Sequence, residues 1–228
     1  MVSDMDKTRD PVNQAIIEHR NKYGTQRLGI ANNYTWTNDP RHLLFSMARY
    51  KFVAKMLSGS GRVIEIGCGD AFCSPIVRQE VGYLKVTDFD PLLIADAVDR
   101  SSEQWPIDAE VHDILEKPLV GEFDAAYSMD VLEHIPTEQD DVFVNHIKAV
   151  LPQNGVLICG MPSIESQVFA SVGSKKGHIN CKTGKDFKQL MERHFGNVFL
   201  FSMNDEVVHT GFEKMAHYLL CLCAGPIK

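Results

Sequence analysis

An α/β fold with a mostly parallel sheet is predicted by two features: a strand that ends in a glycine turn, and acidic residues that close the later strands. The strand is Val63-Ile64-Glu65-Ile66, and the turn is Gly67-Cys68-Gly69. Glycine bends sharply and lets a ligand approach the backbone. A helix expected after the turn would point its positive N-terminus at that ligand. The sequence therefore predicts a doubly wound, Rossmann-like sheet that binds a nucleotide at its carboxyl edge.

The glycine turn departs from the dinucleotide-binding fingerprint at one position. That fingerprint has a third glycine, which lets the helix pack closely on the strand, and Phe72 stands in its place. Glu65 also adds a negative charge beside the turn, which repels a phosphate and suits a cationic amine. The turn therefore favours a cofactor that carries an amine and no phosphate.

The pattern Glu65-x-Gly67-x-Gly69 at a strand end resembles motif I of class I S-adenosylmethionine-dependent methyltransferases. The resemblance continues through residues 62–160 in the order and spacing of that family. It implies S-adenosylmethionine as the cofactor and methyl transfer as the activity. The blocks that carry it after motif I are residues 85–90, 110–114, 123–135 and 151–159.

The resemblance also implies which residues contact the cofactor. Asp90, about 20 residues after the glycines, would hold the ribose hydroxyls; Asp88 is its rival, and Asp90 alternatively caps the following helix. Asp113 would contact the adenine amino group or merely start a turn, and Ile114 would pack on the ring. The full expected cofactor set is Glu65, Gly67, Gly69, Asp90, Asp113, Ile114 and Ser128.

By the same resemblance, the sheet has seven strands with the last antiparallel, and helices cover both faces. Residues 1–57 are expected to form an N-terminal helical cap, with helices at 11–23 and 41–57 joined through a turn-rich link at 33–40. Residues 58–228 form the methyltransferase domain, and the two parts make one structural unit. A long link at 161–182 leaves the fifth strand and should lie over the acceptor site.

Histidine is the natural proton acceptor near neutral pH. We rank His134 first as a general base, because it follows the strand whose end faces the methyl group, and we rank His178 second. The alternative for His134 is a contact with the cofactor, and the alternative for His178 is a position on the surface. Trp36, Arg49 and His209 are expected to contact substrate, or else to serve packing and the surface. Glu133, His134 and Glu138 give only a loose likeness to the metal-binding Glu-His segment of some ubiquinone-type O-methyltransferases, so no metal is expected.

Composition limits the partners and the compartment. The net charge is −7 with no dense basic run, so a nucleic-acid partner is not expected. The six cysteines include no Cys-x-x-Cys pair, so a zinc site is not expected. We expect these thiols to be reduced, which favours a cytoplasmic location. No apolar run approaches the 18 residues of a membrane span, and no signal peptide is expected. The oligomeric state stays open.

The predicted function is S-adenosylmethionine-dependent methyl transfer to a small polar acceptor, at oxygen. Residues 36–40, 48–52 and 162–167 also resemble uncharacterised bacterial methyltransferases linked to surface-polysaccharide synthesis, which implies a hydroxyl of a sugar, a nucleotide-sugar or a phosphorylated precursor as acceptor. Two alternatives remain: a dinucleotide-dependent oxidoreductase, which Glu65 and Phe72 disfavour, and a non-catalytic, methyltransferase-like subunit that only binds the cofactor.

Overall fold

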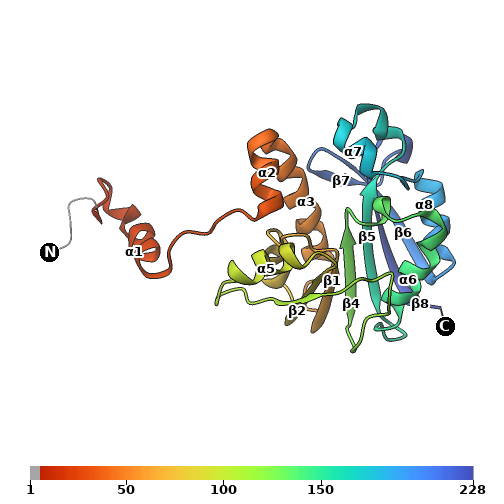
Figure 1. Cartoon of the computed structure of the whole chain (residues 1–228), viewed down its shortest axis with the longest axis horizontal. Helices are drawn as coiled ribbons and strands as arrows, with labels where there is room; N and C mark the ends of the chain where they lie inside the picture. Colours follow the sequence, from red (N-terminus) through yellow and green to blue (C-terminus); the bar gives the residue numbers. More distant parts are fainter. Residues whose placement is uncertain (1–5, 228) are drawn as a thin grey trace.

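The computed structural model describes residues 6–227, and it is an α/β fold with one eight-stranded sheet (Figure 1). The strand order is β3-β2-β1-β4-β5-β8-β6-β7, with helices on both faces. The strands are β1 (Arg62–Ile66), β2 (Tyr83–Asp88), β3 (Asp108–Val111), β4 (Ala125–Met129), β5 (Val156–Pro162), β6 (Phe195–Asn204), β7 (Val207–His209) and β8 (Tyr218–Pro226). The predicted Rossmann-like sheet is confirmed.

Most of the sheet is parallel, and the exceptions lie at its C-terminal half. β1 pairs in parallel with β2 and β4, and β4 with β5. β8 runs antiparallel between β5 and β6, as expected for the last strand. The short β7 folds back on β6 as an eighth strand that was not predicted. Three residues behind a two-residue turn are too few to show a strand period.

The helices lie between the strands and before the first one. The α-helices are α1 (Gln14–Tyr23), α2 (Ile30–Asn38), α3 (Pro40–Met56), α4 (Ser74–Arg78), α5 (Pro91–Asp99), α6 (Asp140–Lys148), α7 (Val172–Gly177) and α8 (Gly184–Glu192). The 3-10 helices include η2 (Pro11–Asn13), η3 (Leu132–His134), η4 (Thr137–Gln139), η5 (Glu165–Phe169) and η6 (Glu213–Met215).

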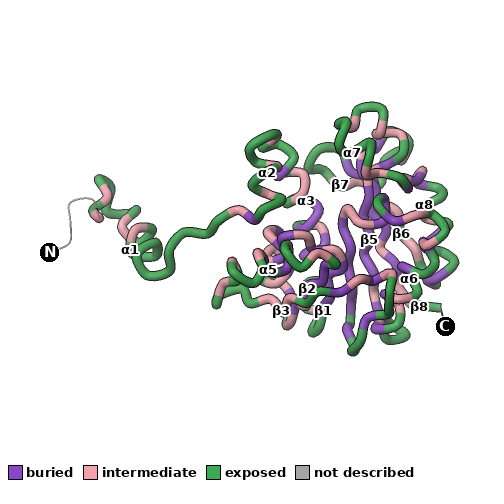
Figure 2. Tube along the Cα trace, viewed as in Figure 1, coloured by how far each residue is buried: buried purple, intermediate pink, exposed green. Residues whose placement is uncertain are grey.

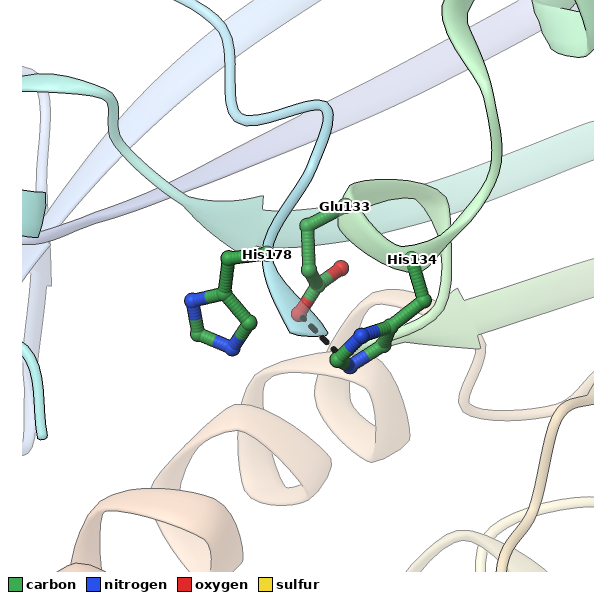
Figure 3. A group of neighbouring side chains, drawn as sticks. All are labelled: Glu133, His134 and His178. Carbon is green, nitrogen blue, oxygen red and sulfur yellow. Dashed lines mark ion pairs between the residues drawn. The ribbon is translucent and has the colours of Figure 1, made fainter. Parts of the chain in front are cut away.

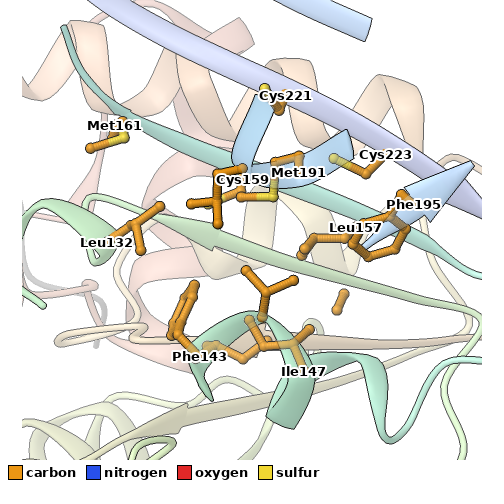
Figure 4. Close-up of a cluster of buried hydrophobic side chains, with 14 of the residues drawn as sticks. Leu132, Phe143, Ile147, Leu157, Cys159, Met161, Met191, Phe195, Cys221 and Cys223 are labelled. Carbon is orange, nitrogen blue, oxygen red and sulfur yellow. The ribbon is translucent and has the colours of Figure 1, made fainter. Parts of the chain in front are cut away.

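Each face of the sheet has its own apolar core, because successive strand residues point to opposite faces. Figure 2 shows that burial is concentrated in the strands and in the helix faces toward them. One core joins β1, β4, β5 and β8 to α6 and α8, and Figure 4 shows Phe143 and Ile147 on one side of it and Met191 on the other. The second core joins the opposite sides of these strands to α3, α4 and α5.

The N-terminal residues divide into an arm and two helices at the carboxyl edge of the sheet. α1 buries no residue and stands apart from the body in Figure 1. α3 belongs to the second core through Tyr50, Val53 and Ala54, so it is part of the main unit. The first five residues of the expected cap lie outside the described residues.

Residues 33–40 do not form the expected link, because α2 occupies most of this stretch. Tertiary contacts hold the helix: the backbone N–H and the side-chain amide of Asn32 both donate to the carboxylate of Asp70, at 2.8 and 2.6 Å. Asp70 lies in the glycine turn after β1. A residue distant in sequence thus stabilises a helix that its own polar composition does not indicate.

The segment 161–182 is also more ordered than a plain link, since it contains η5 and α7. α7 and α2 lie at the same edge of the sheet in Figure 1. A buried network anchors the end of the segment: Lys182 Nζ donates to Asp140 at 2.7 Å, and Asn180 Nδ2 donates to Asp140 at 2.8 Å. The segment therefore returns to the sheet at a fixed point.

Candidate active site

The glycine turn after β1 has the left-handed backbone that its sequence predicted. Gly67 has φ of +72° and Gly69 has φ of +55°. A Cβ on Gly67 would lie 2.2 Å from Val131 Cγ2, whereas a Cβ on Gly69 would have no atom within 4 Å. The backbone at Gly69 therefore faces open space. The expected helix does not start directly after the glycine turn. The next helix, α4, begins only at Ser74 and has five residues.

Glu65 lies inside the protein and not at the open edge, which corrects the expected cofactor contact. Its side chain is fully buried and accepts hydrogen bonds from the hydroxyls of Tyr50 (2.5 Å), Ser74 (2.6 Å) and Tyr127 (2.7 Å). Burial raises its pKa, and the three hydrogen bonds oppose that shift. Glu65 therefore connects α3, α4 and β4 beneath the glycine turn.

Replacing Glu65 with alanine is expected to reduce the free energy of unfolding by about 3–5 kcal/mol, because three buried hydroxyls lose their acceptor. Urea unfolding measures this loss. Glu65→Gln keeps the volume and one carbonyl oxygen, so it should retain more of the stability. A Glu65→Gln variant with wild-type stability and greatly weakened cofactor affinity would instead favour direct contact with the cofactor.

The two aspartates at the end of β2 have different surroundings. Asp88 is buried, and its oxygens accept from the backbone N–H groups of Gly69 and Asp90, each at 2.9 Å. Asp90 Oδ1 caps α5 by accepting from Leu92 N at 2.8 Å, and its Oδ2 accepts no hydrogen bond from the described residues. Asp88 thus holds the glycine turn, while Asp90 combines the helix cap with one free oxygen.

The remaining expected cofactor residues follow β3 and lie within β4. Asp113 comes two residues after the observed end of β3, and its Oδ1 accepts from Leu115 N at 2.8 Å, which is the turn alternative. Ile114 is 7% exposed and belongs to the first core. Ser128 is buried and donates to the Ile66 carbonyl at 2.9 Å, so it joins β1 to β4 and does not face the open edge.

Two histidines meet beyond the ends of β4 and β5. The rings of His134, at the end of η3, and His178, directly after α7, lie 5.2 Å apart between centroids. His134 Nδ1 is 2.9 Å from the Gly177 carbonyl, and His178 Nδ1 is 2.9 Å from the Gln167 side-chain oxygen. The structure thus brings together the two histidines that the sequence ranked as candidate bases.

Glu133 completes this group, and Figure 3 shows its side chain directed between the two histidine rings. Its carboxylate lies between the two rings, 3.9 Å from His134 Nε2, and neither oxygen accepts a hydrogen bond from the described residues. Burial raises its pKa well above the ordinary value, and the nearby Asp130 adds to the shift. Burial also lowers the pKa of His178, with His134 contributing.

Comparisons with known proteins show the family of the chain and its fold. Residues 39–196 match the family model described as a methyltransferase domain, which covers more than half of the chain. The chain belongs to this methyltransferase family. No curated protein matches the chain in sequence.

Solved structures share the fold of this methyltransferase. The N-methyltransferase NodS from Bradyrhizobium japonicum WM9, in complex with S-adenosyl-L-homocysteine, is 16% identical, with 85% of this chain and 92% of that chain covered and a TM-score of 0.62. The methyltransferase domain of bacterial CtHen1-C is 15% identical (80% and 100% covered, TM-score 0.66). Magnesium protoporphyrin IX methyltransferase from Synechocystis PCC 6803, with bound S-adenosylmethionine, is 14% identical (92% and 91% covered, TM-score 0.56).

Arg49 of the methyltransferase, which was expected to contact substrate, is buried and paired with an acidic residue. Its Nη1 donates to both oxygens of Asp130, at 2.8 and 2.7 Å, and its guanidinium lies 3.8 Å above the ring of Tyr218. Asp130 directly follows β4 and has φ of +59°, which is unusual for a residue other than glycine. The pair therefore fixes α3 against the end of β4.

The other two residues expected to contact substrate differ in whether their side chains are free or held by hydrogen bonds. Trp36 lies on α2 and is 53% exposed, so it is available to a ligand at the carboxyl edge. His209 is held within the β6–β7 hairpin: its Nε2 lies 2.8 Å from the Asn204 side-chain oxygen, and its Nδ1 accepts from Gly211 N at 2.9 Å. Both ring nitrogens of His209 are occupied, so the structure does not support the expected substrate contact.

The structure gives roles to two further acidic residues: Asp70 couples the glycine turn to α2, and Asp130 pairs with Arg49. Asp70 follows Gly69 directly in the turn after β1, and Asp130 follows the last residue of β4. Their places in the sequence, just after two expected strands, could have indicated that both belong to the carboxyl edge of the sheet. Within the described residues, no helix is long and apolar enough to cross a membrane.

Proposed function

We propose that the chain transfers the methyl group of S-adenosylmethionine to a hydroxyl of a small polar acceptor, such as a sugar, a nucleotide-sugar or a phosphorylated precursor. The family match establishes methyl transfer and leaves no support for the dinucleotide-dependent oxidoreductase considered from the sequence. The cofactor supplies an activated methyl group on its sulfonium. The protein must position the acceptor and, for a hydroxyl, remove a proton.

The residues at the carboxyl edge fit this cofactor. A side chain at Gly69 would occupy the open space into which the turn faces, so the turn leaves room for a ligand. Asp90 Oδ2 is free to accept from ribose hydroxyls, and Asp113 lies at the end of the neighbouring strand, as contact with adenine requires. Glu65, Asp88 and Ser128 would support these contacts from the interior.

The main support for a hydroxyl acceptor is the pair of neighbouring histidines, His134 and His178. Each ring contacts a carbonyl-type oxygen through Nδ1, and such an oxygen only accepts hydrogen bonds. Nδ1 therefore carries the proton in the neutral ring, and Nε2 keeps a lone pair. His134 and His178 are thus each able to accept a proton from an acceptor hydroxyl, with His134, at 48% side-chain exposure, the more accessible.

Exposed lysines next to this pair suit a phosphorylated acceptor. Lys175 and Lys176 lie in the last turn of α7, directly before Gly177 and His178. Ammonium groups bind phosphate oxygens through charge-assisted hydrogen bonds. This position supports a nucleotide-linked or phosphorylated sugar, the acceptor class that the resemblance to polysaccharide-linked methyltransferases implies. The cytoplasmic location expected from the cysteines remains a prediction.

A methyl-transfer screen tests the proposal. The protein is incubated with S-adenosylmethionine and separate pools of nucleotide-sugars, phospho-sugars, phenols and amines, and products are detected by mass spectrometry as a gain of one methyl group. A methylated sugar or phospho-sugar is the expected result. Methylation of amines alone would overturn the hydroxyl assignment, and cofactor binding without any product would favour the non-catalytic subunit.

Asp90→Ser is expected to weaken S-adenosylhomocysteine binding by about 1.5–3 kcal/mol per lost hydrogen bond while leaving stability nearly unchanged. Serine still caps α5, so the substitution removes the carboxylate and keeps the helix start. Calorimetry measures the affinity, and thermal unfolding measures the stability. Unchanged affinity in this variant, together with a loss in Asp88→Ser, would move the ribose contact to Asp88.

A further inference from the structure

The group formed by Glu133, His134 and His178 has a feature that proton transfer alone does not explain. Glu133 is fully buried, yet neither of its oxygens receives a hydrogen bond within the described part of the chain. Removing a carboxylate from water without a partner is costly, so such a group is neutralised by a proton or by a cation. Figure 3 shows this carboxylate directed at the space between the two imidazoles.

The two histidines offer that space lone pairs. Because Nδ1 of His134 donates to the Gly177 carbonyl, its Nε2 is unprotonated in the neutral ring. The contact of His178 Nδ1 with Gln167 has the same effect, and Gln167 is itself held by its amide nitrogen, which donates to the Ser163 carbonyl at 3.2 Å. Metal-bound histidines characteristically donate their second ring N–H to such an oxygen.

The backbone holds the three residues together before any ligand arrives. Asn180 N donates to the Glu133 carbonyl at 3.0 Å, and Asn180 Nδ2 donates to the Leu132 carbonyl at 3.3 Å. Asn180 is in turn fixed by Asp140 and Lys182. One ligand atom from each of Glu133, His134 and His178 lies within 4.8 Å of the other two. A small inward movement of exposed His134 would bring the three to the separation that one ion requires.

We propose that Glu133, His134 and His178 bind one divalent first-row transition-metal ion at the carboxyl edge of the sheet. Two imidazole nitrogens and one carboxylate oxygen suit Zn²⁺, Fe²⁺, Co²⁺ or Mn²⁺ better than Mg²⁺ or Ca²⁺, which prefer oxygen ligands. The ion would neutralise Glu133 and complete both histidine contacts. This inference replaces the expectation from the sequence that no metal is bound.

Three protein ligands would leave further coordination positions of such an ion for other groups, and the His134 side chain beside it is 48% exposed. The catalytic use of these positions rests on the proposed function, whereas cation binding does not. An acceptor hydroxyl bound there would release its proton to solvent at a lower pH than in water. Its oxygen would then form the O–CH₃ bond as the S–CH₃ bond breaks, leaving S-adenosylhomocysteine.

The direct test is Co²⁺ titration of the full chain after treatment with a chelator, read by visible absorption and by isothermal calorimetry. Wild-type protein is expected to bind one equivalent, with ligand-field bands typical of nitrogen and oxygen ligands, and to bind Mg²⁺ at least tenfold more weakly. Glu133→Gln and His178→Gln should each weaken Co²⁺ binding at least tenfold. His19→Gln, on the exposed α1 arm, is the matched control and should bind as wild type does.

Glu133→Gln also reports on the fold. It removes a buried carboxylate without a partner and keeps its shape, so the metal-free variant should unfold at a temperature at least as high as the wild type. Absence of Co²⁺ binding by wild type, or equal binding by all variants, would overturn the metal site. Cofactor affinity is measured separately with S-adenosylhomocysteine, and its absence would count against the proposed function and not against the metal site.

Discussion

Replacing both His134 and His178 with glutamine is expected to lower kcat for the acceptor found in the screen by about 100- to 10,000-fold. The acceptor hydroxyl would lose both groups that accept its proton or, with a bound cation, two of the ligands that position it. The affinity for S-adenosylhomocysteine should stay within about twofold of wild type, because neither residue is expected to contact the cofactor. Steady-state kinetics and calorimetry measure the two quantities.

Single variants and a chelator separate the two explanations for this loss. If one histidine acts as a base without a cation, its single variant alone should carry most of the decrease, and a chelator should leave wild-type activity intact. If the cation acts, both single variants and the chelator should reduce kcat, and added Co²⁺ should restore the chelated wild type. Near-normal kcat in the double variant would mean that neither group assists, and that transfer proceeds by proximity to an amine or an already ionised oxygen.

The substitution Gly69→Ala is expected to weaken S-adenosylhomocysteine binding by about 100-fold, which corresponds to about 2.7 kcal/mol. A methyl group at this position meets no protein atom, so it projects into the space assigned to the cofactor. Gly67→Val would be a poorer test, because its side chain would collide with Val131 and disturb the fold as well.

Gly59→Ala is the matched control for this experiment. Gly59 also has a positive φ, +85°, and a Cβ there would likewise have no atom within 4 Å, but it lies in the loop before β1 and away from the carboxyl edge. Both variants should lose about 1 kcal/mol of stability from the strained backbone, and only Gly69→Ala should lose cofactor affinity. Equal affinities in the two variants would place the cofactor elsewhere.

The fold could be predicted from the sequence where a strand and the turn after it are specified by residues within one short stretch. Val63–Gly69 and the strands that become β4 and β5 carry their own apolar runs and turn residues, so their places were predictable. The α2 helix was not, because its stability depends on Asp70, and an isolated polar segment contains no sign of that partner. The short β7 likewise depends on pairing with β6.

Within the candidate site, residue type was more predictable than side-chain direction. Strand alternation places Glu65 on the same face as Val63, so its burial had a signal in the sequence. Its partners did not, since Tyr50 and Tyr127 come from 15 residues before and 62 residues after it. The meeting of His134 with His178 depends on how the chain returns after β5, which is a property of the whole sheet.

The position of β8 affects how this protein must fold during synthesis. β8 lies between β5 and β6 in the sheet, yet the ribosome makes it after both. Until β8 emerges, the nascent chain presents an unpaired edge on β5 and another on β6, and such edges pair readily with other chains. A ribosome that stalls before residue 218 would therefore hold a half-sheet prone to aggregation. Production of this protein should therefore benefit from translation without pauses between β6 and β8 and from chaperones that bind exposed strands.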